Sequence, residues 1–294
     1  MINPKVLLSY YYFKGHRPER ELGQPDEQLQ PLYFADSGAF SALTLGAPIT
    51  IEGYATWLEQ WKPWLRGYSN LDVIGDAKGT WYNQQWMEDH GFTPVPTFHV
   101  GEEWSWLEHY LKRYKYIALG VAGMQEKHRA VMSWLGRAFT MAQSYGAVFH
   151  GFALTSWTTL RAFPFYSVDS SSWSSGLRFA TLKLFDSDQG RFVRADYYDP
   201  KTWGRLAWMC EEIGVDARGF MSRATYRSAD AVLLGALAFA KAEQWLREHR
   251  PLVPFPGGTQ PDGPHIMLAM ISHDLRIWVE WLRKYNGREQ GDGG

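Results

Sequence analysis

Two aspartates, Asp36 and Asp169, each end a short apolar segment and precede small or hydroxyl-bearing residues. Asp36 is followed by Ser37 and Gly38, whereas Asp169 is followed by a run of serines. If both segments are strands of one parallel sheet, the two carboxylates meet at the same edge, where one could act as a nucleophile and the other as a general acid or base. Either aspartate alone could instead cap a helix that follows its strand, because Asp and Ser are favoured N-cap residues.

Asp76, His99 and His150 end further apolar segments. A neutral imidazole at His99 or His150 could contact the edge of a base or tune an aspartate, and a hydrogen-bonded structural histidine explains either position equally well. The carboxylate of Asp76 could accept hydrogen bonds from the edge of a purine. An ion pair with Lys78 or a helix cap is the alternative for Asp76.

These residues can meet only if the chain brings many strand ends to one place. Short β-type segments alternate with amphipathic helical segments, which is typical of parallel strands joined by crossover helices. The expected strands are residues 6–12, 33–40, 71–77, 95–100, 116–121, 147–154, 165–170 and 180–185. The expected helices between them are residues 51–65, 82–90, 104–113 and 125–144. This pattern predicts a single (β/α)8 TIM-type barrel, an α/β fold whose active site lies at the carboxyl ends of the strands.

The barrel is expected to form the catalytic core over residues 1–200. Residues 201–286 are expected to add C-terminal helices that pack on the barrel. These helices are expected at residues 203–213, 229–250 and 266–285, with a Pro/Gly-rich connection at 251–264. Residues 287–294 predict a flexible tail.

The composition narrows the classes of function. The formal net charge is -1, so the overall basic character of many nucleic-acid binders is lacking and phosphate contacts would need a local basic surface. Cys210 is the single cysteine, which excludes internal disulfides and a multi-cysteine zinc cluster. The glycine-rich motifs that bind dinucleotides or nucleoside triphosphates do not occur at the start of an expected helix. We therefore expect neither a metal nor a cofactor.

The sequence also predicts a location. No apolar run approaches the ~20 residues that span a bilayer, and the amino terminus shows no secretory signal with a small-residue cleavage site. We therefore expect a cytoplasmic protein without a membrane partner.

Four strings of residues, taken in order, resemble motifs of the tRNA-guanine transglycosylase superfamily. They are Asp36-Ser37-Gly38-Ala39-Phe40, Leu71-Asp72-Val73-Ile74-Gly75-Asp76, Ile117-Ala118-Leu119-Gly120-Val121-Ala122 and Tyr166-Ser167-Val168-Asp169. The resemblance spans roughly residues 6–176 and implies that Asp169 is the nucleophile and Asp36 the general acid or base. The residues that we expect to bind the base are Ser37, Gly38, Asp76, His99, Gly120, Val121, Ala122 and His150.

Two departures from the family pattern narrow the resemblance. Val121 replaces the second glycine of the base-contact loop, and the Cys-x-Cys-x-x-Cys zinc site downstream of the nucleophile is absent. A compact, zinc-free relative is most similar to the phage DNA-guanine transglycosylases of the DpdA type. This similarity implies exchange of guanine in DNA for a free 7-deazaguanine base, such as 7-cyano-7-deazaguanine, in the cytoplasm of a host cell. Whether the protein forms a homodimer stays open.

Basic and aromatic residues could hold the polymer. Phosphate contacts are expected from four residues after the nucleophile strand, Arg178, Lys183, Arg191 and Arg194. Acidic residues are interspersed among them, so a solvated surface of mixed charge is the alternative. Removing a target base from its stack costs free energy, which aromatic side chains could offset. Candidates for this stacking are Tyr10, Tyr11, Tyr12, Trp81 and Trp173.

Three other functions remain open. The first is the same base exchange on tRNA, against which the absent zinc site argues. The second is a retaining glycoside hydrolase, which also fits a barrel with two carboxylates and many tryptophans; its carboxylates lie ~5–5.5 Å apart. The third is a catalytically inactive barrel that binds nucleic acid.

Overall fold

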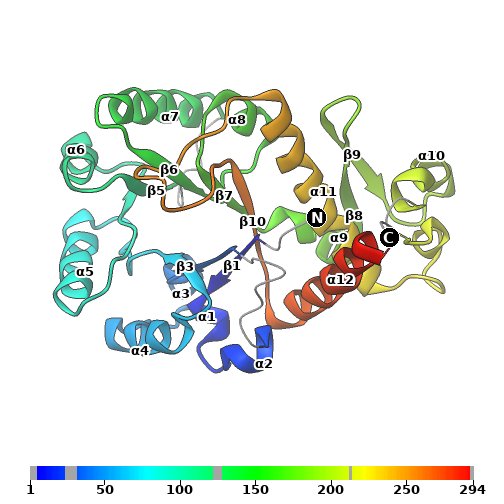
Figure 1. Ribbon diagram of the computed structural model, residues 1–294, viewed down its shortest axis with the longest axis horizontal. Helices are drawn as coiled ribbons and strands as arrows, with labels where there is room; N and C mark the ends of the chain where they lie inside the picture. Colours follow the sequence, from blue (N-terminus) through cyan, green and yellow to red (C-terminus); the bar gives the residue numbers. More distant parts are fainter. Residues whose placement is uncertain (1–4, 24–31, 122–127, 212–213, 292–294) are drawn as a thin grey trace.

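The computed structural model describes residues 5–23, 32–121, 128–211 and 214–291 of the chain. It is an α/β fold with a curled, eight-stranded parallel sheet surrounded by helices, an arrangement consistent with a TIM-like barrel (Figure 1). The strands follow the order β3-β2-β1-β10-β7-β6-β5-β4. Their bounds are β1 Lys5–Ser9, β2 Leu32–Asp36, β3 Leu65–Tyr68, β4 Thr97–His99, β5 Tyr116–Gly120, β6 Val148–Phe152, β7 Ser167–Ser170 and β10 His265–Ala269.

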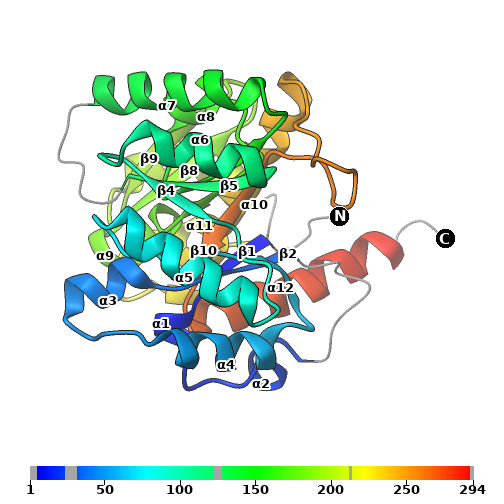
Figure 2. The same cartoon turned by 90° about the vertical axis from the view of Figure 1, so that its left-hand side faces the viewer.

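The described residues form α-helices, most of which lie around this sheet. They are α1 Tyr10–Phe13, α2 Pro18–Leu22, α3 Ala39–Leu45, α4 Ile51–Trp61, α5 Ala77–Asp89, α6 Trp104–Arg113, α7 His128–Gln143, α8 Trp157–Ala162, α9 Ser175–Phe179, α10 Pro200–Glu211, α11 Ser228–His249 and α12 Ser272–Gly291. Short 3-10 helices are η1 Ser172–Ser174 and η2 Ala217–Phe220. Figure 2 shows α3 and α9, which follow β2 and β7, on the same side of the molecule. No helix in the described segments is both long and apolar enough to span a bilayer.

Local signals in the sequence account for the helices that follow the early strands. α6 has the bounds that the sequence predicts, and its buried residues Leu107, Tyr110 and Leu111 follow the spacing of one helix face. α4 begins after Thr50, whose side chain accepts a hydrogen bond from the backbone nitrogen of Gly53. Apolar periodicity therefore predicts both ends of α6 and the start of α4, whereas α4 ends at Trp61, four residues before the predicted end.

Alternation along the strands divides the sheet into an outer and an inner face. Val6 and Leu8 belong to the main apolar core beneath the helices, whereas Leu7 between them belongs to a separate cluster. This inner cluster consists of Leu7, Leu32, Phe34, Val95, Ala118 and Met267. Because side chains alternate with a period of two, Asp36 lies on the same face as Phe34. The polar residues at the strand ends therefore continue the inner layer.

The two outermost strands of the sheet, β3 and β4, approach each other. The nitrogen of Val95 donates to the carbonyl of Tyr68 at 2.8 Å, and the nitrogen of Asn70 donates to the carbonyl of Val95 at 3.0 Å. Ser69 and Val95 form a parallel bridge at the same place. These bonds place the carboxyl end of β3 beside the amino end of β4.

The eighth strand of the sheet is not the predicted one. Residues 180–185 fall in β8, Thr181–Asp186, which pairs only with the antiparallel β9, Arg191–Asp196, among the described strands. This hairpin packs with α10 and η2 around a second, smaller core in which Cys210 is fully buried. Figure 1 shows the hairpin and α10 to one side of the sheet.

β10 takes the place of the expected eighth strand. It lies between β1 and β7, within a segment predicted as the start of a helix at 266–285. A short apolar run fits a buried strand and a buried helix equally well by periodicity, and here the pairing on both sides decides. The sheet therefore takes strands from both sides of the expected boundary at residue 200.

A second prediction that was wrong concerns residues 71–77. β3 ends at Tyr68, and the later residues form a turn in which Gly75 has a φ of +86° before α5 begins at Ala77. A glycine with positive φ marks a turn rather than a strand. The error matters for the site, because it changes which aspartate of this string faces the inner layer.

A buried carboxylate ties β1 and β10 to α11. Glu243 on α11 is 6% exposed and forms an ion pair with Lys5 at the start of β1. Its other oxygen accepts a hydrogen bond of 2.6 Å from the backbone nitrogen of Ile266 on β10. Glu243 thus binds the amino-terminal ends of two strands, whereas the candidate site lies at the carboxyl ends.

Candidate active site

The structure brings Asp36 and Asp169 into one electrostatic environment. Asp36 is the last residue of β2, and Asp169 lies near the end of β7, which is separated from β2 in the sheet by β1 and β10. Burial raises the pKa of Asp36 to about 7, and the negative charges of Asp72 and Asp169 contribute to this rise. Near neutral pH Asp36 therefore exists in both its protonated and its ionised form, as a general acid or base requires.

The turn after β2 holds the carboxyl of Asp36. Its Oδ2 atom accepts a hydrogen bond of 3.0 Å from the backbone nitrogen of Gly38. Gly38 has a φ of +77°, and a Cβ atom there would lie 2.5 Å from the Cβ atom of Tyr11. Only glycine fits this position without strain, because other residues rarely adopt positive φ and the space is filled.

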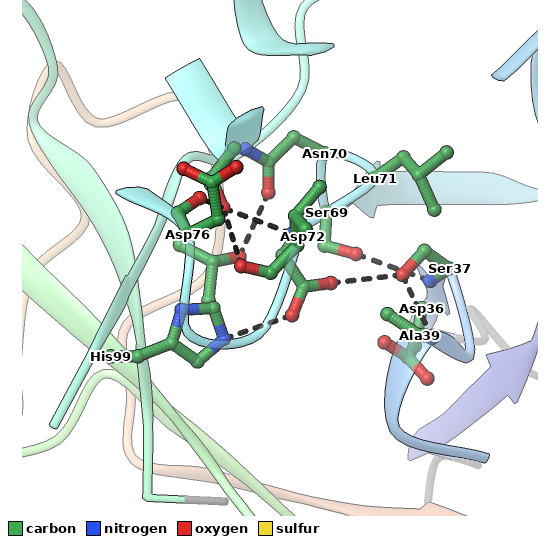
Figure 3. Close-up of polar contacts among 12 residues, drawn as sticks. Asp36, Ser37, Ala39, Ser69, Asn70, Leu71, Asp72, Asp76 and His99 are labelled. Carbon is green, nitrogen blue, oxygen red and sulfur yellow. Dashed lines mark hydrogen bonds and ion pairs between the residues drawn. The ribbon is translucent and has the colours of Figure 1, made fainter. Parts of the chain in front are cut away.

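Asp72 lies between Ser37 and His99 (Figure 3). The Ser37 hydroxyl donates to Asp72 Oδ1 at 3.0 Å, and His99 Nε2 lies 2.9 Å from Asp72 Oδ2. On the other side of the ring, His99 Nδ1 lies 3.1 Å from Glu102 Oε1. Ser37 and His99 are buried, and the side chain of Asp72 is 11% exposed.

His99 carries a positive charge at neutral pH. Burial alone would lower its pKa, but the hydrogen bonds to Asp72 and Glu102 outweigh burial and raise the pKa to about 9. The ring also explains why residue 120 on β5 is a glycine, because a Cβ atom there would lie 2.6 Å from Cδ2 of His99. The imidazolium ring therefore holds Asp72 Oδ2 in place and leaves no room for a side chain at Gly120.

Asp169 is held from two sides. Its Oδ1 atom accepts a hydrogen bond of 2.9 Å from the backbone nitrogen of Ala153, and His150 Nε2 lies 3.5 Å from the same oxygen. Ala153 is a non-glycine residue with a φ of +54°, a backbone conformation that costs free energy. The His150 ring is fully buried and stacks on Phe34 with 5.0 Å between ring centroids.

The structure places Asp76 away from this cluster. Asp76 is exposed and caps α5, where its Oδ1 atom accepts from the backbone nitrogens of Lys78 and Gly79. The cap is one of the two alternatives that the sequence left open. Asp72, four residues earlier, is the carboxylate whose charge contributes to the raised pKa of Asp36, and the sequence analysis did not single it out because it set the strand too late in the chain.

The remaining expected base-binding residues are placed in part. Val121 follows β5 and is partly exposed, whereas Ala122 lies outside the described residues. Gly120 uses its carbonyl oxygen to accept a hydrogen bond of 2.9 Å from the nitrogen of Val100. The contact of this loop with the base therefore stays a prediction.

The expected phosphate contacts with described side chains lie on both faces of the β8–β9 hairpin. Lys183 and Arg194 are exposed and lie opposite each other, whereas Arg191 lies opposite Asp186, three residues further along and therefore on the other face. Arg194 is bound by Asp196 at 2.9 Å, which supports the mixed-charge alternative. The side chain of Arg178 lies outside the described part of the structure.

Of the aromatic residues expected at the rim, Trp173 is not available for stacking. It is 1% exposed, and its ring nitrogen donates to the carbonyl of Ala269 at 3.0 Å. Tyr12 is 48% exposed on α1, directly after β1, and Trp81 packs against His109. Tyr12 is therefore the most exposed of these five rings.

No group of three or more His, Cys, Asp or Glu side chains able to hold a metal ion occurs among the residues that the structure describes. The candidate site described above consists of Asp36, Asp72, His99, His150 and Asp169. Comparison of the chain with protein-family models, with curated proteins and with solved structures found no match.

Proposed function

We propose that this chain is a nucleic-acid guanine transglycosylase that exchanges guanine in DNA for a free 7-deazaguanine base. The different surroundings of two electrostatically coupled carboxyl groups carry the proposal. Asp36 has a pKa raised by burial to about 7, whereas Asp169 is held by the nitrogen of Ala153 and faces His150. A carboxyl that titrates near neutral pH suits proton transfer, and a fixed carboxylate suits attack on a sugar carbon.

In the proposed reaction Asp169 attacks the anomeric carbon of a target deoxyguanosine from the face opposite the base. The new carbon–oxygen bond forms as the carbon–nitrogen bond breaks, and protonated Asp36 gives its proton to the departing guanine. The incoming 7-deazaguanine then loses its ring N–H proton to Asp36 while its nitrogen attacks the same carbon and releases Asp169. Two inversions give net retention, as in retaining glycosidases.

Asp72 is the carboxylate that we assign to reading the base. Ser37 and His99 each use one hydrogen bond on its oxygens, and a carboxylate has about four acceptor positions. The remaining positions can accept hydrogen bonds from the N–H groups on the edge of guanine. Such bonds distinguish guanine from bases that lack these donors, which an apolar pocket does poorly. Asp76 is engaged as a helix cap and has no such role in the proposal.

The proposed scaffold is a closed (β/α)8 barrel. The bonds between Tyr68, Asn70 and Val95, which join β3 to the segment before β4, support closure. A closed barrel gathers the carboxyl ends of β2, β4, β6 and β7 around one mouth, where a base removed from its stack can enter. We further propose DNA rather than tRNA as the acceptor, in the cytoplasm of a host cell, on the strength of the sequence resemblance.

The test is incorporation of labelled guanine or 7-cyano-7-deazaguanine into duplex DNA, single-stranded DNA and tRNA. Asp169→Asn, which keeps the shape of the side chain, is the control. Label in DNA that disappears in this variant supports the proposal. Label only in tRNA would move the assignment to tRNA modification, and no label in any polymer would remove it.

The assignment of Asp72 has its own prediction, with Asp76 as the matched control in the same string. Asp72→Asn should raise KM for the free base about tenfold or more, because one acceptor becomes a donor facing the base. Asp76→Asn should leave KM nearly unchanged, because asparagine also caps helices well. The opposite result would return the reading of the base to Asp76.

A second function is also compatible with the raised pKa of Asp36. A carboxyl with a pKa raised to about 7 beside a second carboxylate also suits the general acid and nucleophile of a retaining glycoside hydrolase. Such an enzyme would release sugar from an oligosaccharide or an aryl glycoside and would not bind free guanine. Hydrolysis of these substrates without base exchange would favour it.

A further inference from the structure

A chain of hydrogen-bonding groups lies behind Asp169 on the inner face of the sheet. Tyr116 Oη and Ser167 Oγ are 2.5 Å apart, and Ser167 Oγ and His150 Nδ1 are 2.7 Å apart. His150 Nε2 lies 3.5 Å from Asp169 Oδ1. These residues come from three neighbouring strands, β5, β6 and β7, and His150 pairs in register with Ser167. The chain is therefore built into the rigid part of the fold.

The surroundings fix the His150 ring. It is fully buried, stacks on Phe34 at an interplanar angle of 15°, and meets the edge of Phe152 with 4.6 Å between ring centroids. Its Nε2 atom is buried and has no hydrogen-bond partner at normal distance. Asp169 Oδ1 is the acceptor that this nitrogen faces, and such catalytic contacts often shorten once substrate is bound.

The available protons determine which group donates in each hydrogen bond between Tyr116, Ser167 and His150. Burial raises the pKa of the Tyr116 hydroxyl well above its usual value, so this hydroxyl keeps its proton and can donate to Ser167. A serine that accepts from Tyr116 gives its own single proton to His150 Nδ1, and the ring proton must then be on Nε2. The reverse direction would aim a nitrogen lone pair at the Asp169 carboxylate, which is repulsive.

We propose that His150 is a positioning residue for Asp169, held by Tyr116 and Ser167 as the tautomer that donates from Nε2. This inference rests on the proposed role of Asp169 as the nucleophile, and it replaces the expected base contact of His150. Ala153 and His150 both act on Oδ1, which leaves Oδ2 of Asp169 for attack on the sugar carbon. The carboxylate is thereby oriented before substrate arrives, which lowers the cost of reaching the transition state.

The first test reads the tautomer and needs no substrate. Nitrogen-15 NMR of histidine-labelled protein distinguishes the two tautomers and the imidazolium, and the His150 signals are those absent from His150→Gln. We expect the Nε2–H tautomer in the wild type and a mixture of tautomers in Tyr116→Phe. Tyr166→Phe is the matched control, because it removes a neighbouring tyrosine hydroxyl that is bonded to the carbonyl of Pro261 instead. An Nδ1–H tautomer or an imidazolium in the wild type would overturn the inference.

The second test uses base exchange. Tyr116→Phe and Ser167→Ala should each lower kcat about tenfold, as loss of one orienting hydrogen bond implies, with KM for the free base unchanged. Tyr166→Phe should leave both constants unchanged. A raised KM with unchanged kcat would overturn the inference in favour of a base contact. If the wild type exchanges no base, the proposed function fails by itself, and the NMR spectrum still supports or overturns the tautomer and its chain.

Discussion

The carboxyl of Asp36 makes the stability of the protein depend on pH. Its pKa is raised from 3.8 to about 7 by burial and by the charges of Asp72 and Asp169. Between these values the folded protein keeps a proton that the unfolded chain has released, so the free energy of unfolding falls as the pH rises toward 7. Asp36→Asn removes the cost of ionising this buried carboxyl, so the variant should be more stable than the wild type at pH 8 by roughly 3–4 kcal/mol.

Urea unfolding at pH 5 and pH 8 measures this effect. The difference between Asp36→Asn and the wild type should grow from the lower to the higher pH. Asp76→Asn is the control, because it changes an exposed helix cap of the same residue type. A difference that is equal at both pH values would contradict the buried, charge-coupled environment of Asp36.

The His99 imidazolium also makes stability fall as the pH rises, but here the charged form is the one that stabilises the folded protein. Its pKa is raised from 6.5 to about 9, because the bonds to Asp72 and Glu102 outweigh burial. Its contribution is therefore fully present below the unfolded value and is lost as the pH rises through 9. His99→Gln should lower the free energy of unfolding at pH 6 by about 2–3 kcal/mol and by much less at pH 10. His90→Gln, at an exposed histidine, is the control, and equal losses at both pH values would contradict the charge.

At the level of elements, α3 offers a matched pair of glycines. Gly38 precedes the helix and Gly46 follows it, and both have positive φ, +77° and +66°. A Cβ atom at Gly38 would lie 2.5 Å from the Cβ atom of Tyr11, whereas one at Gly46 meets nothing within 4 Å. Gly46→Ala should cost about 1 kcal/mol for backbone strain alone. Gly38→Ala should cost roughly 3 kcal/mol or more, because strain and overpacking add. Equal losses in urea unfolding would show that the turn after β2 can relax.

The elements also show what the sequence could predict. Strands such as β5 and helices such as α6 carry regular apolar patterns, so their positions were predictable from local spacing. β3 was not, because Leu65–Tyr68 is short and has little apolar character, while the turn at residues 71–76 contains three apolar residues. The same error explains the site. Asp36 and Asp169 could be selected as strand ends, but choosing Asp72 over Asp76 depends on where β3 ends.

For the whole molecule, the limit of prediction is long-range pairing. β10 is separated from β7 by more than ninety residues in the sequence and from β1 by almost the full chain, and no local signal specifies either partner. β8 has a strand pattern as regular as that of a strand of the main sheet, so pattern alone placed residues 180–185 in that sheet. Only the packing of the completed fold distinguishes the two.

This arrangement predicts that residues 1–200 do not fold alone. Without β10, strands β1 and β7 each lose a parallel partner, and Lys5 loses the buried carboxylate of Glu243. The free energy that remains cannot offset the conformational entropy of a half-open sheet with two unpaired central edges. We expect the fragment to lack cooperative thermal unfolding and dispersed amide signals in NMR spectra. Co-expression with residues 201–294 as a separate chain should restore both, since that chain supplies β10 and α11. Cooperative unfolding of the fragment by itself would mean that the sheet can form without β10.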